Sequence, residues 1–64
     1  MTEIQLYDQV RIVTSRFEGD GVVAGMRGYV VEKFADGEFE VEVSDPATGE
    51  TVALLTVRPG DVER

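Results

Sequence analysis

Side chains that most enzymes use for acid–base or nucleophilic chemistry are missing from this chain. It contains no histidine and no cysteine, which removes the commonest general base, the commonest metal ligand and any thiolate site. Ser15 and Ser44 therefore have no histidine to activate them as nucleophiles. The glycine-rich residues 18–28 lack the Gly-Lys-Ser/Thr ending of a phosphate-binding loop. A carboxylate pair remains, but a domain this small rarely encloses a substrate pocket, so we expect no enzyme and no cofactor.

Acidic side chains are the main chemical feature of the sequence. Glu38, Glu40 and Glu42 alternate with apolar residues, so they project from one face of a predicted strand. Residues two apart on a strand are separated by about 6.5–7 Å, too far to share one cation without ligands from loops. We therefore predict no metal site. The row fits either a solvated face that discourages aggregation or a docking surface for a basic partner.

The charge balance limits the partners that we expect. The net charge is −7, from 13 acidic and 6 basic residues, which argues against nucleic acid and against anionic membranes. No apolar stretch approaches the length of a membrane span, and the first residues lack the features of a signal peptide. We expect a cytoplasmic protein, monomeric or homodimeric, whose partner is another protein with a basic or mixed surface.

The elements are organised around a hairpin over residues 28–43. Phe39, Val41 and Val43 alternate with the glutamates, which is typical of a strand with one buried face and one wet face. Residues 29–34 are rich in β-branched and aromatic side chains, and they predict the preceding strand.

The turn of this hairpin predicts its register. Asp36-Gly37 is a strong signal for a two-residue loop, which sets Phe34 opposite Phe39. We disfavour a three-residue loop, because it places the two rings on opposite faces. Glu32 then falls on the apolar face, which indicates a bulge or a position at the rim.

The remaining chain predicts three more strands: residues 9–14, residues 51–57 and a short strand at Val62. A long connection over residues 15–26 precedes the hairpin, and a 3₁₀-like turn at residues 59–61 precedes the last strand. The chain is one domain over residues 1–64, with residues 1–6 as a lead-in. The predicted inner set is Val10, Ile12, Val30, Phe34, Phe39, Val41, Val43, Val52, Leu54 and Val62.

An apolar patch is predicted on the outer face. A four-residue loop over residues 46–49 turns Leu54 inward, which leaves Val31 and Leu55 pointing outward beside the glutamates. This patch is either an interface or a surface that Ile4 and Leu6 of the lead-in cover. The candidate partner-binding residues are the acidic row, this patch and the first loop: Glu38, Glu40, Glu42, Val31, Leu55, Phe17, Glu18 and Asp20.

The layout of four clear strands, a long first loop, a short turn and a fifth strand matches an all-β, SH3-like, five-stranded antiparallel barrel. Residues 8–13, 25–32, 37–43 and 53–57 resemble a family of small bacterial SH3-like domains of unknown function, and the resemblance runs from residue 6 to residue 62. It implies a prokaryotic stand-alone barrel, and the lack of catalytic side chains together with the acidic and apolar surface leads us to expect a protein–protein interaction module. It also implies a gene beside that of a partner, as for some antitoxins and immunity proteins.

Two other resemblances and one structural alternative give further hypotheses. Residues 25–31 resemble the KOW motif of barrels that associate with the ribosome or RNA polymerase, which implies an accessory of that machinery. Residues 6–8 resemble the start of eukaryotic SH3 domains, but the chain has no tryptophan for an aromatic polyproline groove. A homodimer formed by strand pairing at an open edge is the third hypothesis.

Overall fold

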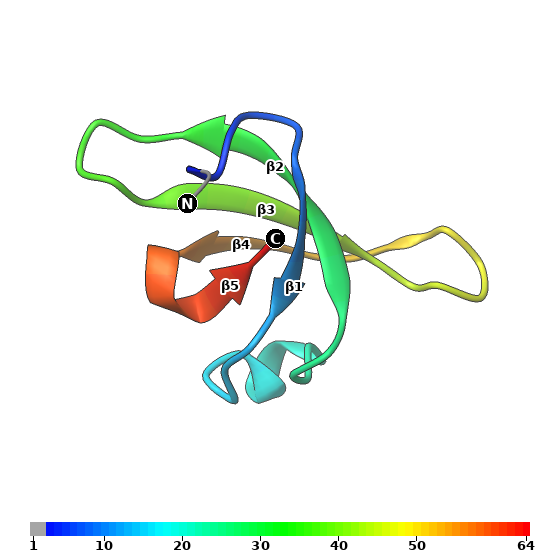
Figure 1. Cartoon of the computed structure of the whole chain (residues 1–64). Coiled ribbons are helices and arrows are strands. Elements are labelled where there is room, and N and C mark those ends of the chain that lie inside the picture. Colours follow the sequence, from blue (N-terminus) through cyan, green and yellow to red (C-terminus); the bar gives the residue numbers. More distant parts are fainter. Residues whose placement is uncertain (1–2) are drawn as a thin grey trace.

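The computed structural model describes residues 3–64 and contains five antiparallel strands in one sheet (Figure 1). The first two residues of the predicted lead-in lie outside the described residues. In this range no helix has the length and apolar character needed to cross a membrane. The elements are β1 (Gln9–Ile12), η1 (Glu18–Asp20), β2 (Arg27–Lys33), β3 (Phe39–Ser44), β4 (Thr51–Val57), η2 (Pro59–Asp61) and β5 (Val62–Glu63), where η denotes a 3₁₀ turn.

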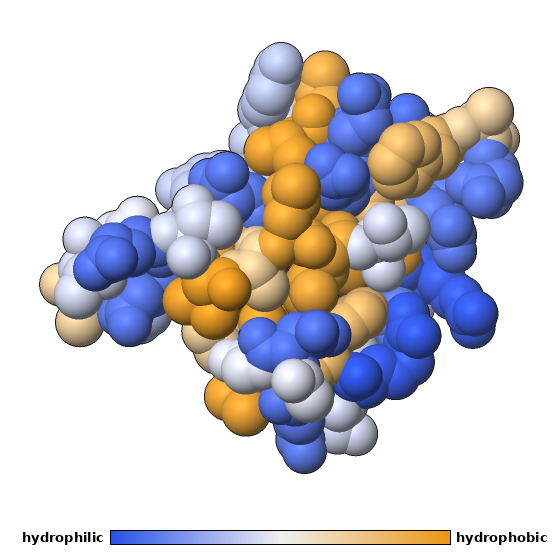
Figure 2. Space-filling model, turned by 180° about the vertical axis from the view of Figure 1, so that it is seen from behind, coloured by the Kyte–Doolittle hydropathy of each residue, from blue (hydrophilic) through white to orange (hydrophobic). Residues whose placement is uncertain are grey.

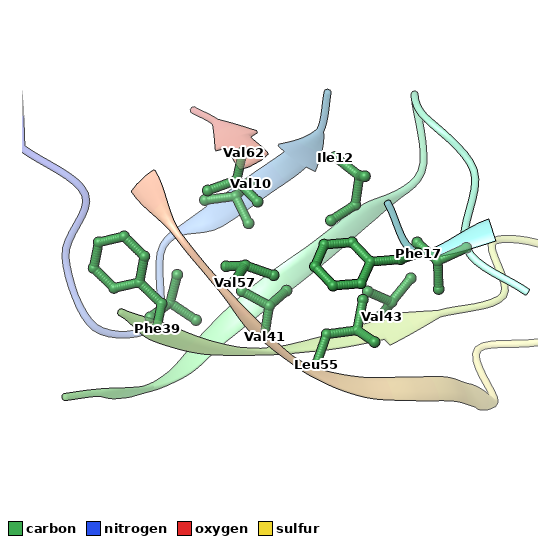
Figure 3. Close-up of a cluster of buried hydrophobic side chains, with 11 residues drawn as sticks. Val10, Ile12, Phe17, Phe39, Val41, Val43, Leu55, Val57 and Val62 are labelled. Atoms are coloured by element: carbon green, nitrogen blue, oxygen red, sulfur yellow. The ribbon is translucent and has the colours of Figure 1, made fainter. Parts of the chain in front are cut away.

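The strands lie in the order β4-β3-β2-β1-β5, and the sheet bends around its core. β1 and β5 lie on one side of the apolar cluster and β3 on the other, while β2 crosses between them (Figure 3). β4 and β5 are the two edges, and between residues 3 and 64 they do not pair with each other. The predicted five antiparallel strands are confirmed, whereas closure of the sheet into a barrel is not.

Strand positions follow the hydrophobic alternation closely. β3 and β4 occupy the predicted residues, and the predicted turn before β5 is η2. Seven residues of the predicted inner set are buried, because they alternate with polar residues on strands that face the core. These are Val10, Ile12, Val30, Phe39, Val41, Val43 and Val62.

The first hairpin has a three-residue loop, so the predicted register is wrong. The Phe34 N–H donates to the Glu38 carbonyl oxygen (2.8 Å). Gly37 adopts a φ of 90°, the left-handed position that closes a three-residue loop compatible with strand twist. Lys33 therefore pairs with Phe39. Phe39 is buried, while Phe34 lies outside the core and is 40% exposed.

A bulge in β2 compensates for the longer loop. The register shifts between Val30 and Glu32, which makes Val31 an extra residue in β2. The extra loop residue and the extra strand residue together displace the pairing by two positions, so Val30 still faces the core, opposite Val41. The irregularity predicted near Glu32 is confirmed. The three-residue loop sets Glu32 opposite Glu40, on the outer face, and the bulge then returns Val30 to the core.

A second bulge changes which side chains of β4 are buried. The four-residue loop is as predicted, with Ser44 paired to Thr51, but the register then shifts at Val52. One extra residue reverses the faces of all that follow, so Leu55 is buried and Leu54 is 58% exposed. The inward positions predicted for Val52 and Leu54 and the outward position predicted for Leu55 are therefore wrong.

The first loop and the lead-in both complete the core. Phe17 and Val22 of the loop are buried, so both side chains pin the loop to the sheet. Ile4 packs against the core cluster, while Leu6 is 41% exposed. The Tyr7 N–H donates to the Val30 carbonyl oxygen (2.6 Å), which extends the pairing of β1 with β2. The lead-in is thus part of the fold.

The β4 register predicts opposite outcomes for two adjacent leucines. Leu55→Ala should lower the free energy of unfolding by about 2–4 kcal/mol, because it leaves a cavity in the core. Leu54→Ala should change it by about 0.5 kcal/mol or less, because its side chain is mostly in solvent. Urea denaturation of both variants measures the difference. The reverse order of stabilities would show that β4 has no bulge at Val52.

Candidate docking surface

The outer face of β2, β3 and β4 combines apolar and acidic side chains. Tyr29, Glu42 and Leu54 are cross-strand neighbours in one row, so their side chains point to the same side. Tyr29 is 49% exposed and Leu54 58% exposed, on either side of the half-buried Glu42. The Gln9 amide nitrogen donates to the Tyr29 hydroxyl (3.4 Å), which continues the row onto β1.

The next row of this face places two glutamates opposite each other. Glu40 pairs with Glu32 on β2 and with Thr56 on β4. The two-residue loop predicted from Asp36-Gly37 would set Lys33 opposite Glu40, but in the structure the Lys33 ammonium lies 5.8 Å from the centre of the Phe39 ring. Like charges in directly opposed positions destabilise a sheet. The acidic face is therefore less neutralised than the sequence predicts.

Glu38 lies directly before the first residue of β3 and continues the acidic row along the chain. Its carboxylate lies 3.9 Å from the Arg58 guanidinium, an exposed pair that contributes little to stability. Glu38, Glu40 and Glu42 are all half-buried, as expected for side chains that lean across a sheet. The prediction that Glu40 and Glu42 alternate with buried residues and share the outer face is confirmed.

The apolar members of the predicted surface need correction. Leu55 and Phe17 are each 7% exposed and belong to the core, so neither side chain is available to a partner. Val31, the bulge residue of β2, is half-buried. Leu54 is the exposed leucine in place of Leu55. The alternation in the sequence could not distinguish them, because the two adjacent residues are both leucine. Glu18 and Asp20 of η1 are exposed.

Two hollows lie on the surface, and only the first borders this face, at Tyr29. One of about 420 Å³ is lined by residues that include Tyr29, Met26 and Pro46. The other, about 390 Å³, lies between Ile4 and Phe34. Figure 2 shows apolar residues as a band through the middle of the surface, with hydrophilic residues on both sides. Across residues 3–64 no cluster of three or more acidic residues is arranged to hold a metal ion.

The one buried charged side chain of the described residues is Asp61, in η2. Its carboxylate accepts hydrogen bonds from the Arg16 guanidinium (2.8 and 3.3 Å) and from the Arg58 backbone N–H (2.9 Å). The hydrogen bond from Arg16 lowers the pKa of Asp61 below its usual value, and this outweighs burial, which raises it. Arg16 also stacks over the Phe17 ring, 4.6 Å from its centre. The cluster therefore clamps the first loop to η2.

This clamp predicts a loss of stability in acid. Because the pKa of folded Asp61 is below the ordinary 3.8, its stabilisation is present at pH values above that and is lost as pH falls through the lowered pKa. Asp61→Asn should cost about 1–3 kcal/mol at neutral pH and should flatten the pH dependence. Thermal unfolding between about pH 7 and pH 2 measures both effects.

Glu63→Gln is the matched control for the clamp. Glu63 pairs with Arg11, and both side chains are about half exposed, so its removal should cost less than about 1 kcal/mol. Equal losses of stability for the two variants would mean that the buried Asp61 pair stabilises the fold no more than the exposed Glu63 pair does.

Comparison with known proteins places the whole described fold in one family. The model of a domain of unknown function, DUF4926, matches residues 6–64. No curated protein and no solved structure matches the chain. The match confirms the predicted relation to a domain family of unknown function.

Proposed function

The chain belongs to this family, DUF4926, and we propose that it is a non-enzymatic module that docks on another protein through the outer face of β2, β3 and β4. The observation that supports this is the direct opposition of Glu32 and Glu40 beside Glu42. A sheet that keeps like charges opposed gives up stability locally, and such departures from local optimisation are typical of functional surfaces.

The chemistry of this face indicates the partner. Three carboxylates attract Lys and Arg side chains, and Arg binds carboxylates through two hydrogen bonds at once. Tyr29 and Leu54 flank the acids and are about half exposed, which supplies the apolar contact that a purely charged surface lacks. The surface fits a partner that presents basic side chains between apolar ones.

The topology supports the finer proposal of an SH3-like barrel. A long first loop precedes the β2-β3-β4 meander, and η2 leads into β5, which pairs with β1. Small barrels of this kind commonly serve as binding modules on larger assemblies. A bacterial, cytoplasmic antitoxin- or immunity-like accessory of a neighbouring gene's product is the concrete form of the proposal.

The proposal predicts a stoichiometric partner whose binding depends on the glutamates. The tagged protein should co-purify with that partner from its native host, and Glu40→Lys or Glu42→Lys should weaken binding about tenfold or more, because the new cation repels the basic surface. Binding should also weaken at raised salt. Calorimetry with the purified partner measures both effects.

Glu50→Lys is the matched control, because it makes the same charge change in the exposed β3–β4 loop. Its effect on affinity should be small. A partner that binds all three variants as it binds the unmodified protein, or no partner under several growth conditions, would refute docking through this face.

A further inference from the structure

β4 is an edge of the sheet whose backbone is free on one side. It pairs with β3 and with no other strand. The backbone hydrogen bonds formed outside the sheet by residues 3–64 involve none of Thr51–Val57. In an antiparallel pair, every second residue directs its N–H and C=O away from its partner strand. β4 therefore presents a row of unused donors and acceptors.

This edge has little of the protection that sheet edges usually carry. Thr51–Val57 is the longest stretch of the chain without a charged residue, and it contains no proline. Its one protective feature is the bulge at Val52, near the start of the strand. The opposite edge, β5, has only two residues, and its Glu63 forms an ion pair with Arg11. The two edges thus differ, and only β4 is open to a further strand.

The side chains around β4 indicate what would bind there. A strand added to β4 lies one spacing from Leu54 and Thr56 and two spacings, roughly 10 Å, from Glu42 and Glu40. The stems of Lys or Arg can lie along the exposed Leu54 with their charges toward these carboxylates. On the other face, the added strand lies beside the half-buried Ala53, which packs against the core and favours apolar side chains.

We propose that β4 pairs with an extended segment of the partner protein in which apolar and basic residues alternate, so that the segment becomes a sixth strand. This rests on the proposed docking function and names the form of the partner's contact. The charge of −7 on each chain favours such a basic segment over a second copy, whose own glutamates would approach those of the first. Main-chain hydrogen bonds supply affinity, and the alternation supplies specificity.

The test uses synthetic peptides and the intact protein. A nine-residue peptide of alternating Val and Lys, blocked at both ends, is titrated into isotope-labelled protein. We expect amide shifts centred on Thr51–Val57 and slower hydrogen exchange there. A peptide of alternating Val and Glu should bind at least tenfold more weakly, and so should the Val/Lys peptide with every backbone nitrogen methylated, because it cannot donate to the edge.

A charge exchange sharpens the test. Thr56 is exposed and outward-facing on β4, so Thr56→Lys should weaken the Val/Lys peptide about tenfold and strengthen the Val/Glu peptide. Ala47→Lys adds the same charge in the exposed β3–β4 loop and should change neither affinity appreciably. Thermal unfolding of both variants verifies that they are folded.

Three results would overturn the added strand. These are shifts centred away from β4, equal binding by the methylated peptide, and a dimer with protected β4 amides in the absence of peptide, which would make a second copy the occupant. If Glu40→Lys abolishes partner binding while Thr56→Lys and the Val/Lys peptide leave it unchanged, the docking function stands and the added strand is wrong. Peptide pairing at β4 without any cellular partner supports the edge and refutes the docking function.

Discussion

The small core depends on the face that each residue of β2 and β4 turns inward, and one bulge in each of these strands determines that face. Of the described residues, 11 apolar side chains are buried, and most are valines. Each buried side chain contributes about 1.5–3 kcal/mol, so a core of this size cannot lose several of them and remain stable. An extra residue at Val31 keeps Val30 opposite Val41, and an extra residue at Val52 brings Leu55 and Val57 inside. Without them the strands would form in the same places around a different and poorer core.

This explains which parts of the fold were predictable from the sequence. Alternation and turn residues gave the strand positions, because both depend on local residue type. The faces of β4 were not predictable, because Leu54 and Leu55 are identical and either register buries a leucine. The length of the loop between β2 and β3 was also mispredicted, because Gly37 suits a two-residue turn and a three-residue turn equally. The positions of Glu40 and Glu42 were predicted correctly despite these errors, since both belong to β3, which contains no extra residue. The apolar patch predicted beside them was wrong, because it depended on the register of β4.

The observed register brings acidic and exposed apolar side chains together on the outer face. It moves Glu32 across from Glu40 and removes Lys33 from that face. It also exchanges the buried Leu55 for the exposed Leu54, beside Glu42. Acidic and apolar groups thus adjoin each other on three neighbouring strands, and the same register leaves the uncharged β4 at the rim of that face. The proposed docking function and the proposed added strand are both argued from this register.

The pairing of β1 with β5 has a consequence for the order of folding. Ile12 and Val62 are partners although about 50 residues separate them, whereas β2, β3 and β4 are joined by short loops. Contacts between distant residues form slowly, because the entropy of closing the chain must be overcome first. The meander can therefore assemble while its inner valines are still uncovered, and the Asp61 clamp can form only after the last strand arrives. In that interval the carboxylates of β3 on different chains repel one another, which opposes the stacking of nascent sheets face to face.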